Sequence, residues 1–200
     1  MSYEHLEREY IITKSATRAG LPPLPEDPKE ALAWMRSGVK NDDSRATFEL
    51  AQAYQYGKCG ISINMKTAVK LYKRAVELGS TDSMVQLGFF YEFGRKPARL
   101  DKQKALALYK KAADSGDPNG QFYYARTVCP DLTKYTLADA MRRDPKILEA
   151  AHYFKLSADQ GDTDGVAARE CGICLQLVHD STLARFACLR ARRGKATGWR

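Results

Sequence analysis

Apolar and small residues recur along this chain at helical spacing, and the whole pattern returns every 37 residues. Ala31, Ala68 and Ala105 lie 37 residues apart, and so do Leu50 and Leu87. Between these positions, apolar residues fall three or four apart with polar residues around them, which is typical of amphipathic helices. A fixed period of this length indicates a stacked array, in which each unit packs mainly on its neighbours.

The hydrophobic stripes predict a series of paired helices. We expect helices over 28–39, 44–56, 65–78, 81–93, 102–115, 118–128, 146–160, 164–178 and 181–193. Side chains that cap helices mark several starts: Asp27 followed by Pro28, then Asn64 and Asp101. Glycines mark the ends, at Gly57, Gly79, Gly94, Gly116 and Gly161.

One glycine falls inside a predicted helix. Gly88 costs about 1 kcal/mol relative to alanine at such a position. Its counterpart one repeat earlier is Ala51. Because both residues are small, we expect a close approach between helices there.

The repeat divides the chain into an array with two flanking segments. We expect units at about 44–79, 81–116, 117–161 and 162–193, preceded by the helix at 28–39. The third unit is eight residues longer than its predecessors, through a loop at 129–144. Residues 1–27 form a leader with a proline-containing linker, and residues 194–200 form a flexible basic tail.

Three segments carry a resemblance to a known family. The octapeptides LAQAYQYG at 50–57 and LGFFYEFG at 87–94 resemble the first half of the Sel-1-like repeat, a relative of the tetratricopeptide repeat. KALALYKKAADSG at 104–116 resembles its second half. The resemblance implies an all-α fold, a right-handed α/α superhelical solenoid of three to four helix pairs. It also implies a protein-interaction scaffold without catalytic residues or a cofactor.

A scaffold of this kind is expected to bind a partner protein in the concave groove lined by its first helices. The candidate contact residues are Gln52, Gln55, Phe89, Phe90, Glu92, Tyr123 and Arg126. For the Phe89–Phe90 pair, packing alone is the favoured interpretation, since buried aromatic residues are routine. The alternative is that one ring packs in the core and the other is exposed as an anchor for a partner.

The net charge of +8 is unevenly distributed. Residues 1–180 are nearly neutral at +2, whereas residues 181–200 carry six cations and no acid. This basic segment contains Arg185, Arg190, Arg192, Arg193, Lys195 and Arg200. An alternative function is therefore association of this segment with a polyanion, either nucleic acid or an acidic surface. No motif for sequence-specific nucleic-acid recognition accompanies it.

The sequence favours a cytoplasmic protein, with the nucleus as the alternative, and not a secreted one. No apolar run approaches the ~18–20 residues of a membrane span. Residues 1–10 lack the apolar core of a signal peptide. Five cysteines at irregular spacing fit a reducing compartment.

The remaining chemical signals are weak. Cys171, Cys174 and His179 invite a metal site, but an apolar helical stretch separates them, so we interpret the cysteines as buried and structural. Ser37 and Lys40 have the S-x-x-K spacing of β-lactamase-like hydrolases, a remote alternative that lacks its partner motifs. We therefore expect no enzyme, no cofactor and no metal.

Overall fold

The structure, a computed structural model, describes residues 24–130, 145–161 and 170, and the secondary structure of this part consists of α-helices joined by loops. Its helices are α2 (Pro28–Lys40), α3 (Ser44–Tyr56), α4 (Met65–Glu77), α5 (Thr81–Glu92), α6 (Lys102–Asp114), α7 (Pro118–Val128) and α9 (Pro145–Asp159). Each predicted helix end within this part lies within one residue of its observed position. The predicted helices at 164–178 and 181–193 lie outside the described residues.

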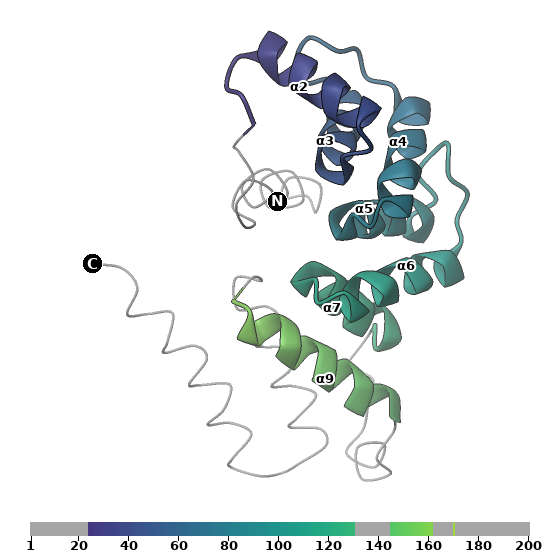
Figure 1. The fold of residues 1–200 in the computed structure, drawn as a ribbon. Helices are drawn as coiled ribbons and strands as arrows, with labels where there is room; N and C mark the ends of the chain where they lie inside the picture. The colour runs from purple at the N-terminus through teal and green to yellow at the C-terminus, as the bar shows by residue number, and fades with distance from the viewer. Residues whose placement is uncertain (1–23, 131–144, 162–169, 171–200) are drawn as a thin grey trace.

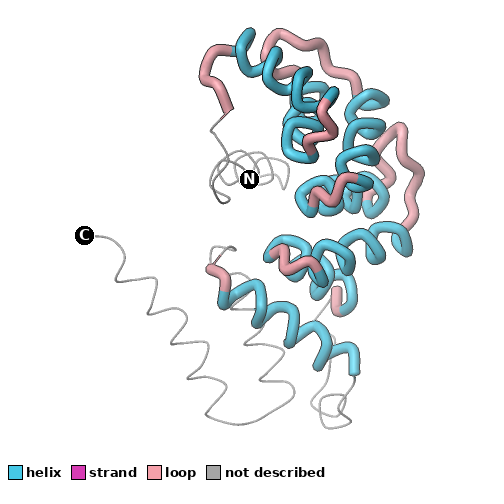
Figure 2. Tube along the Cα trace, viewed as in Figure 1, coloured by secondary structure: helices cyan, strands magenta, loops and turns pink. Residues whose placement is uncertain are grey.

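Helices adjacent in the sequence pack side by side and build an arc (Figure 1). Helices α3, α5 and α7 lie on the inner side of this arc, and α4 and α6 lie on the outer side. The loops that join α3 to α4 and α5 to α6 lie on the same outer side of the array (Figure 2). The predicted all-α solenoid is therefore confirmed.

The helix ends are fixed by the capping residues that the sequence predicted. The Asp27 carboxylate accepts hydrogen bonds from the backbone nitrogens of Lys29 and Glu30, both at 3.0 Å. Asn64 and Asp101 cap α4 and α6 in the same way. Gly57 ends α3 in the left-handed conformation, with φ of 72°, where a side chain would be strained.

The core is a continuous series of small and aromatic side chains between the helices. Tyr72 lies between Phe48 and Phe90, with ring centroids 5.9 and 6.0 Å away. Tyr109 occupies the equivalent place in the next unit. A Cβ atom at Gly88 would lie 2.4 Å from the Tyr109 ring, so only glycine lets the two helices approach this closely. The close approach expected at Gly88 is confirmed.

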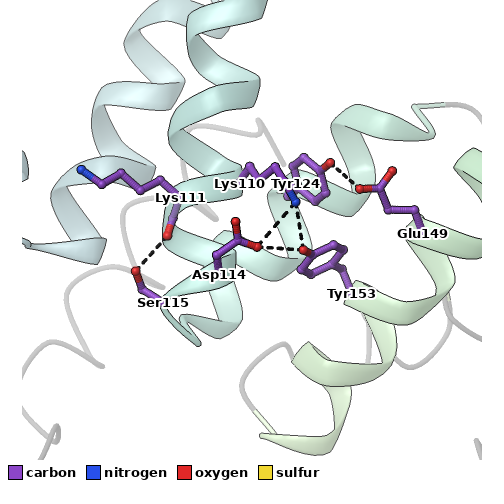
Figure 3. A network of polar contacts seen from close by, with 7 residues as sticks. All are labelled: Lys110, Lys111, Asp114, Ser115, Tyr124, Glu149 and Tyr153. Atoms are coloured by element: carbon purple, nitrogen blue, oxygen red, sulfur yellow. Dashed lines mark hydrogen bonds and ion pairs between the residues drawn. The ribbon is translucent and has the colours of Figure 1, made fainter.

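Helix α9 follows the eight-residue insertion and still packs in the repeat register. Ala150 and Phe154 are buried in the places that Ala105 and Tyr109 take one unit earlier. A polar network joins α9 to the preceding pair on its other face (Figure 3). The Tyr153 hydroxyl donates to Asp114 at 2.8 Å and accepts from the Lys110 ammonium at 3.2 Å.

The aromatic rings in this network hold the Lys110 side chain from two sides. Its ammonium lies 4.9 Å from the centroid of Tyr124 and 5.3 Å from that of Tyr153. The Tyr124 hydroxyl donates to Glu149 at 2.6 Å, which adds a direct link between α7 and α9. Because these contacts join three helices, they set the position of α9 independently of the insertion.

Candidate functional site

The candidate residues of the inner face lie on α3, α5 and α7, and the repeat aligns them. Gln52, Phe89 and Arg126 are 37 residues apart and occupy equivalent positions on the three helices. Gln55 and Glu92 form a second row one helical turn further on. The helices that carry these two rows, α3, α5 and α7, line the inner side of the arc (Figure 1).

The Phe89–Phe90 pair is buried, at 3% and 1% exposure. Phe90 packs against Tyr72, whereas Phe89 lies edge-on to Tyr123 at a centroid distance of 4.5 Å. The favoured interpretation, that the pair serves packing, is confirmed, and the alternative of an exposed anchor is wrong. An inner helix of a solenoid contacts both its own partner helix and the next unit, so two adjacent residues can both face the core.

The second row forms a buried hydrogen bond that recurs in two units. The Tyr72 hydroxyl donates to Gln55 at 2.6 Å, and the Tyr109 hydroxyl donates to Glu92 at 2.7 Å. Burial, reinforced by nearby acidic or phenolic groups, raises the pKa of both tyrosines well above the ordinary value. These pairs fasten each inner helix to its outer partner.

The third unit replaces both members of this pair together. Cys129 stands where Gln55 and Glu92 stand, and Phe154 stands where the tyrosines stand. Both replacements are buried, at 2% and 1% exposure. Phe154 has no hydroxyl that would need a hydrogen-bond acceptor, so Cys129 can stand where the other units have Gln55 or Glu92. The two replacements together therefore leave no buried tyrosine hydroxyl without an acceptor.

A half-buried ion pair crosses from α5 to α7. Arg126 Nη2 lies 3.4 Å from Glu92 Oε1, with side-chain exposures of 23% and 20%. The guanidinium carbon lies 4.8 Å from the centroid of the Tyr123 ring. Glu92 therefore accepts a hydrogen bond from the Tyr109 hydroxyl and also pairs with the Arg126 guanidinium, which packs against the Tyr123 ring.

Gln52 is buried beside this surface, at 1% exposure. Its carbonyl oxygen accepts from the Lys58 ammonium at 3.5 Å. Its amide nitrogen, within the described part of the chain, donates no hydrogen bond. A buried amide donor without an acceptor costs roughly 1–3 kcal/mol.

A repeated pair of cation and ring at the ends of α3 and α5 was missed from the sequence. Lys58 lies 5.6 Å from the Tyr56 ring centroid, and Arg95 lies 5.7 Å from that of Phe93. Phe93 is 48% exposed and stacks on Phe89. The 37-residue spacing of Lys58 and Arg95 could have identified this pair.

The remaining candidates gain no support from the geometry. Ser37 and Lys40 are both exposed at the end of α2. The described ranges hold no cluster of three metal-binding side chains and no helix with the length and hydropathy of a membrane span. Cys171, Cys174, His179, the basic segment Arg185 to Lys195 and most of the loop at 129–144 lie outside the described residues.

Comparison with known proteins identifies repeats over most of the chain. The family model of the Sel1 repeat matches residues 17–43, 44–80, 81–117 and 138–162. No curated protein matches the chain.

Two solved structures have a similar fold. One is a protective antigen of uropathogenic Escherichia coli strains displaying an SLR fold, with a TM-score of 0.64 and 23% identity. The other is a Sel1 repeat protein from Oxalobacter formigenes, with a TM-score of 0.63 and 23% identity. The likeness covers 98% and 82% of this chain but only 38% and 64% of those chains. At this identity the likeness establishes the fold.

Proposed function

The chain belongs to the Sel1 repeat family, and from this premise we propose that it is a non-catalytic scaffold whose inner face binds a segment of a partner protein. Sel1 repeat proteins generally mediate protein–protein interaction, and the repeat is typically a non-catalytic scaffold fold. The partner segment lies along α3, α5 and α7. Its side chains and backbone meet Glu92, Tyr123 and Arg126, which are partly exposed there.

The observation that carries this proposal is the ion pair between Glu92 and Arg126. It is partly desolvated, at 20–23% exposure, and it stands on the aromatic ring of Tyr123. Charged groups in such a setting interact more strongly than fully exposed ones, and arginine is enriched in binding hot spots. Because helix packing fixes these side chains before binding, little conformational entropy is lost on association.

The test compares variants of the inner and outer faces of the full chain. A partner is first captured with the unmodified protein, and its affinity is then measured for a double variant, Glu92→Gln with Arg126→Met. Glutamine keeps an acceptor for the Tyr109 hydroxyl, as Gln55 does for Tyr72, and methionine retains an apolar stem over Tyr123, so the packing is preserved. We expect affinity to fall at least tenfold, as truncation of hot-spot residues produces.

The matched control replaces two exposed cations on the outer helix α4, Lys70→Met with Lys73→Met. We expect this variant to bind the partner within about twofold, since surface charges outside an interface contribute little. Unchanged binding by the inner variant, with loss in the outer variant, would overturn the proposal. Alanine at Phe89 or Phe90 is unsuitable because removing a buried ring costs about 3–5 kcal/mol of stability.

We further propose that the protein acts in the cytoplasm. Cys59 is a free thiol, in keeping with a reducing compartment. Fluorescence imaging of the tagged full chain tests this, and accumulation in the nucleus would contradict it.

A further inference from the structure

Positive charge is concentrated in the array as well as in the C-terminal segment. Residues 64–111 contain eleven Lys and Arg but only four Asp and Glu, so this stretch alone carries +7. The net charge of residues 1–180 is near zero because acidic residues elsewhere in that range offset this basic stretch. The described array therefore has a strongly basic region of its own.

The densest part is the edge formed by the loops that join the inner to the outer helices. We define this loop edge as residues 56–66 and 93–104. It holds seven cations: Lys58, Lys66, Arg95, Lys96, Arg99, Lys102 and Lys104. Its one acid, Asp101, caps α6 and pairs with Lys104 at 2.8 Å, and these contacts lower the pKa of the carboxyl group. The edge therefore has a net charge of +6.

Exposed apolar side chains gather on the same edge. Ile63 and Leu100 are 64% and 62% exposed, and they lie 37 residues apart at equivalent places in two units. Phe93 and Met65 are 48% and 36% exposed. Of the five large apolar side chains that the described residues expose, four lie here. Both loops lie on the outer side of the arc (Figure 2).

We propose that the loop edge is a peripheral docking surface for an anionic lipid bilayer, with Ile63 and Leu100 entering the interface and the surrounding cations meeting lipid phosphates and carboxylates. Apolar side chains flanked by lysine and arginine are the composition that binds the membrane interface. The cytoplasmic leaflet carries the anionic lipids that attract such clusters. Both loops of the edge lie on the outer side of the arc, although Lys58 and Phe93 also contact Gln52 and Phe89 of the inner helices (Figure 2).

The apolar residues favour lipid over nucleic acid. Phosphates of a nucleic acid would satisfy the cations but would leave Ile63 and Leu100 without an apolar contact. Single-stranded nucleic acids are held largely by stacking on aromatic rings. Phe93, the exposed aromatic ring of the edge, already stacks on Phe89 and carries Arg95. A bilayer offers both the negative charge and the apolar phase that this surface requires.

The test measures sedimentation of the full chain with vesicles of phosphatidylcholine alone and with 30% phosphatidylserine. We expect binding only to the anionic vesicles, weakening with added salt as the Debye length falls from about 8 Å at 0.15 M to about 3 Å at 1 M. Each cation near the surface is worth about 1 kcal/mol. Lys96→Gln, Arg99→Gln and Lys102→Gln together are therefore expected to weaken binding roughly 100-fold.

A second variant, Ile63→Ser with Leu100→Ser, tests the apolar contribution without changing the charge. Both side chains are more than 60% exposed, so the fold is expected to persist, and binding is expected to fall by about tenfold or more. The matched control removes three exposed cations from α2, Lys29→Gln, Arg36→Gln and Lys40→Gln. Circular dichroism verifies that each variant is folded.

Several results would overturn the proposal. These are absence of vesicle binding, equal binding to neutral vesicles, equal loss in the α2 control, and an unchanged affinity in either edge variant. Binding that disappears only when the six cations of residues 181–200 are replaced would assign the interaction to that segment. Edge-dependent binding to nucleic acid or to an acidic protein, without binding to anionic vesicles, would likewise replace a lipid partner with another class.

Discussion

At the scale of single residues, Gly88 shows how tightly the helices are packed. Alanine ordinarily favours a helix by about 1 kcal/mol over glycine. Here its Cβ would meet the Tyr109 ring, which is fully buried and hydrogen-bonded to Glu92. We therefore predict that Gly88→Ala lowers the free energy of unfolding by about 1–3 kcal/mol, as overpacking does. Urea denaturation measures this change.

A smaller side chain at position 109 provides the control for that prediction. In the background Tyr109→Leu, the added methyl group has room, and Gly88→Ala should cost less than in the parent chain. The difference is the coupling energy between the two sites. Equal costs in both backgrounds would mean that the ring is not what excludes a side chain at Gly88.

Glu92 has two roles that substitution can separate. Glu92→Gln keeps an acceptor for the Tyr109 hydroxyl, as Gln55 does for Tyr72, but removes the ion pair with Arg126. We predict a loss of less than about 1 kcal/mol for Glu92→Gln, because partly exposed ion pairs contribute little. Glu92→Leu leaves a buried hydroxyl unsatisfied and is predicted to cost roughly 1–3 kcal/mol. Thermal unfolding compares the two, and equal losses would contradict the assignment.

The buried tyrosines predict instability in alkali. Burial raises the pKa of Tyr72 and Tyr109 far above normal, and burial with the Glu149 contact raises the pKa of Tyr124 to about 12. A pKa raised by folding contributes stability that is complete below the unfolded value of about 10 and is lost as pH rises through the folded value.

We therefore predict that the free energy of unfolding falls above pH 10, by up to about 1.4 kcal/mol per pH unit for each such tyrosine. Denaturation measured from pH 8 to pH 11.5 tests this. Tyr109→Phe removes one titrating group and should flatten the decline. A decline equally steep in that variant would show that other groups cause it.

At the scale of elements, the attachment of α9 is carried by a few polar groups. Tyr153→Phe keeps the ring against Tyr124 and Lys110 but removes the hydrogen bonds to Asp114 and Lys110. We predict a loss of about 1 kcal/mol, confined to α9. Hydrogen exchange of α9 amides should accelerate while α3 and α4 remain unchanged. Uniform acceleration over all helices would mean that α9 does not open separately.

The helices themselves could be predicted closely because their ends carry local signals. Asp27, Asn64 and Asp101 cap the N-termini of helices, and glycines with positive φ follow the C-termini. A few adjacent residues therefore determine each of these boundaries. The insertion did not disturb the prediction of α9, since its buried face repeats that of α6. The sequence favoured packing for Phe89 and Phe90 but left an exposed anchor open, because the burial of the second ring depends on contacts from the next unit.

At the scale of the whole molecule, the period alone predicted a helical array, but it could not predict which polar residues meet. The Glu92–Arg126 pair joins residues 34 apart on different units, and no local pattern identifies such a contact. The near-neutral net charge of residues 1–180 likewise gave no indication of the basic loop edge. The inner helices, the outer helices and the loop edge are three distinct surfaces, and the proposals assign protein binding and lipid docking to different ones.

The most direct test of the scaffold assignment is a hydrogen-exchange footprint of the full chain with its captured partner. The account predicts that binding protects amides of α3, α5 and α7, with protection strongest around Glu92 and Arg126, and leaves the outer turns of α4 and α6 unchanged. Protection confined to α4, α6 or the loop edge, with the inner helices unaffected, would contradict it.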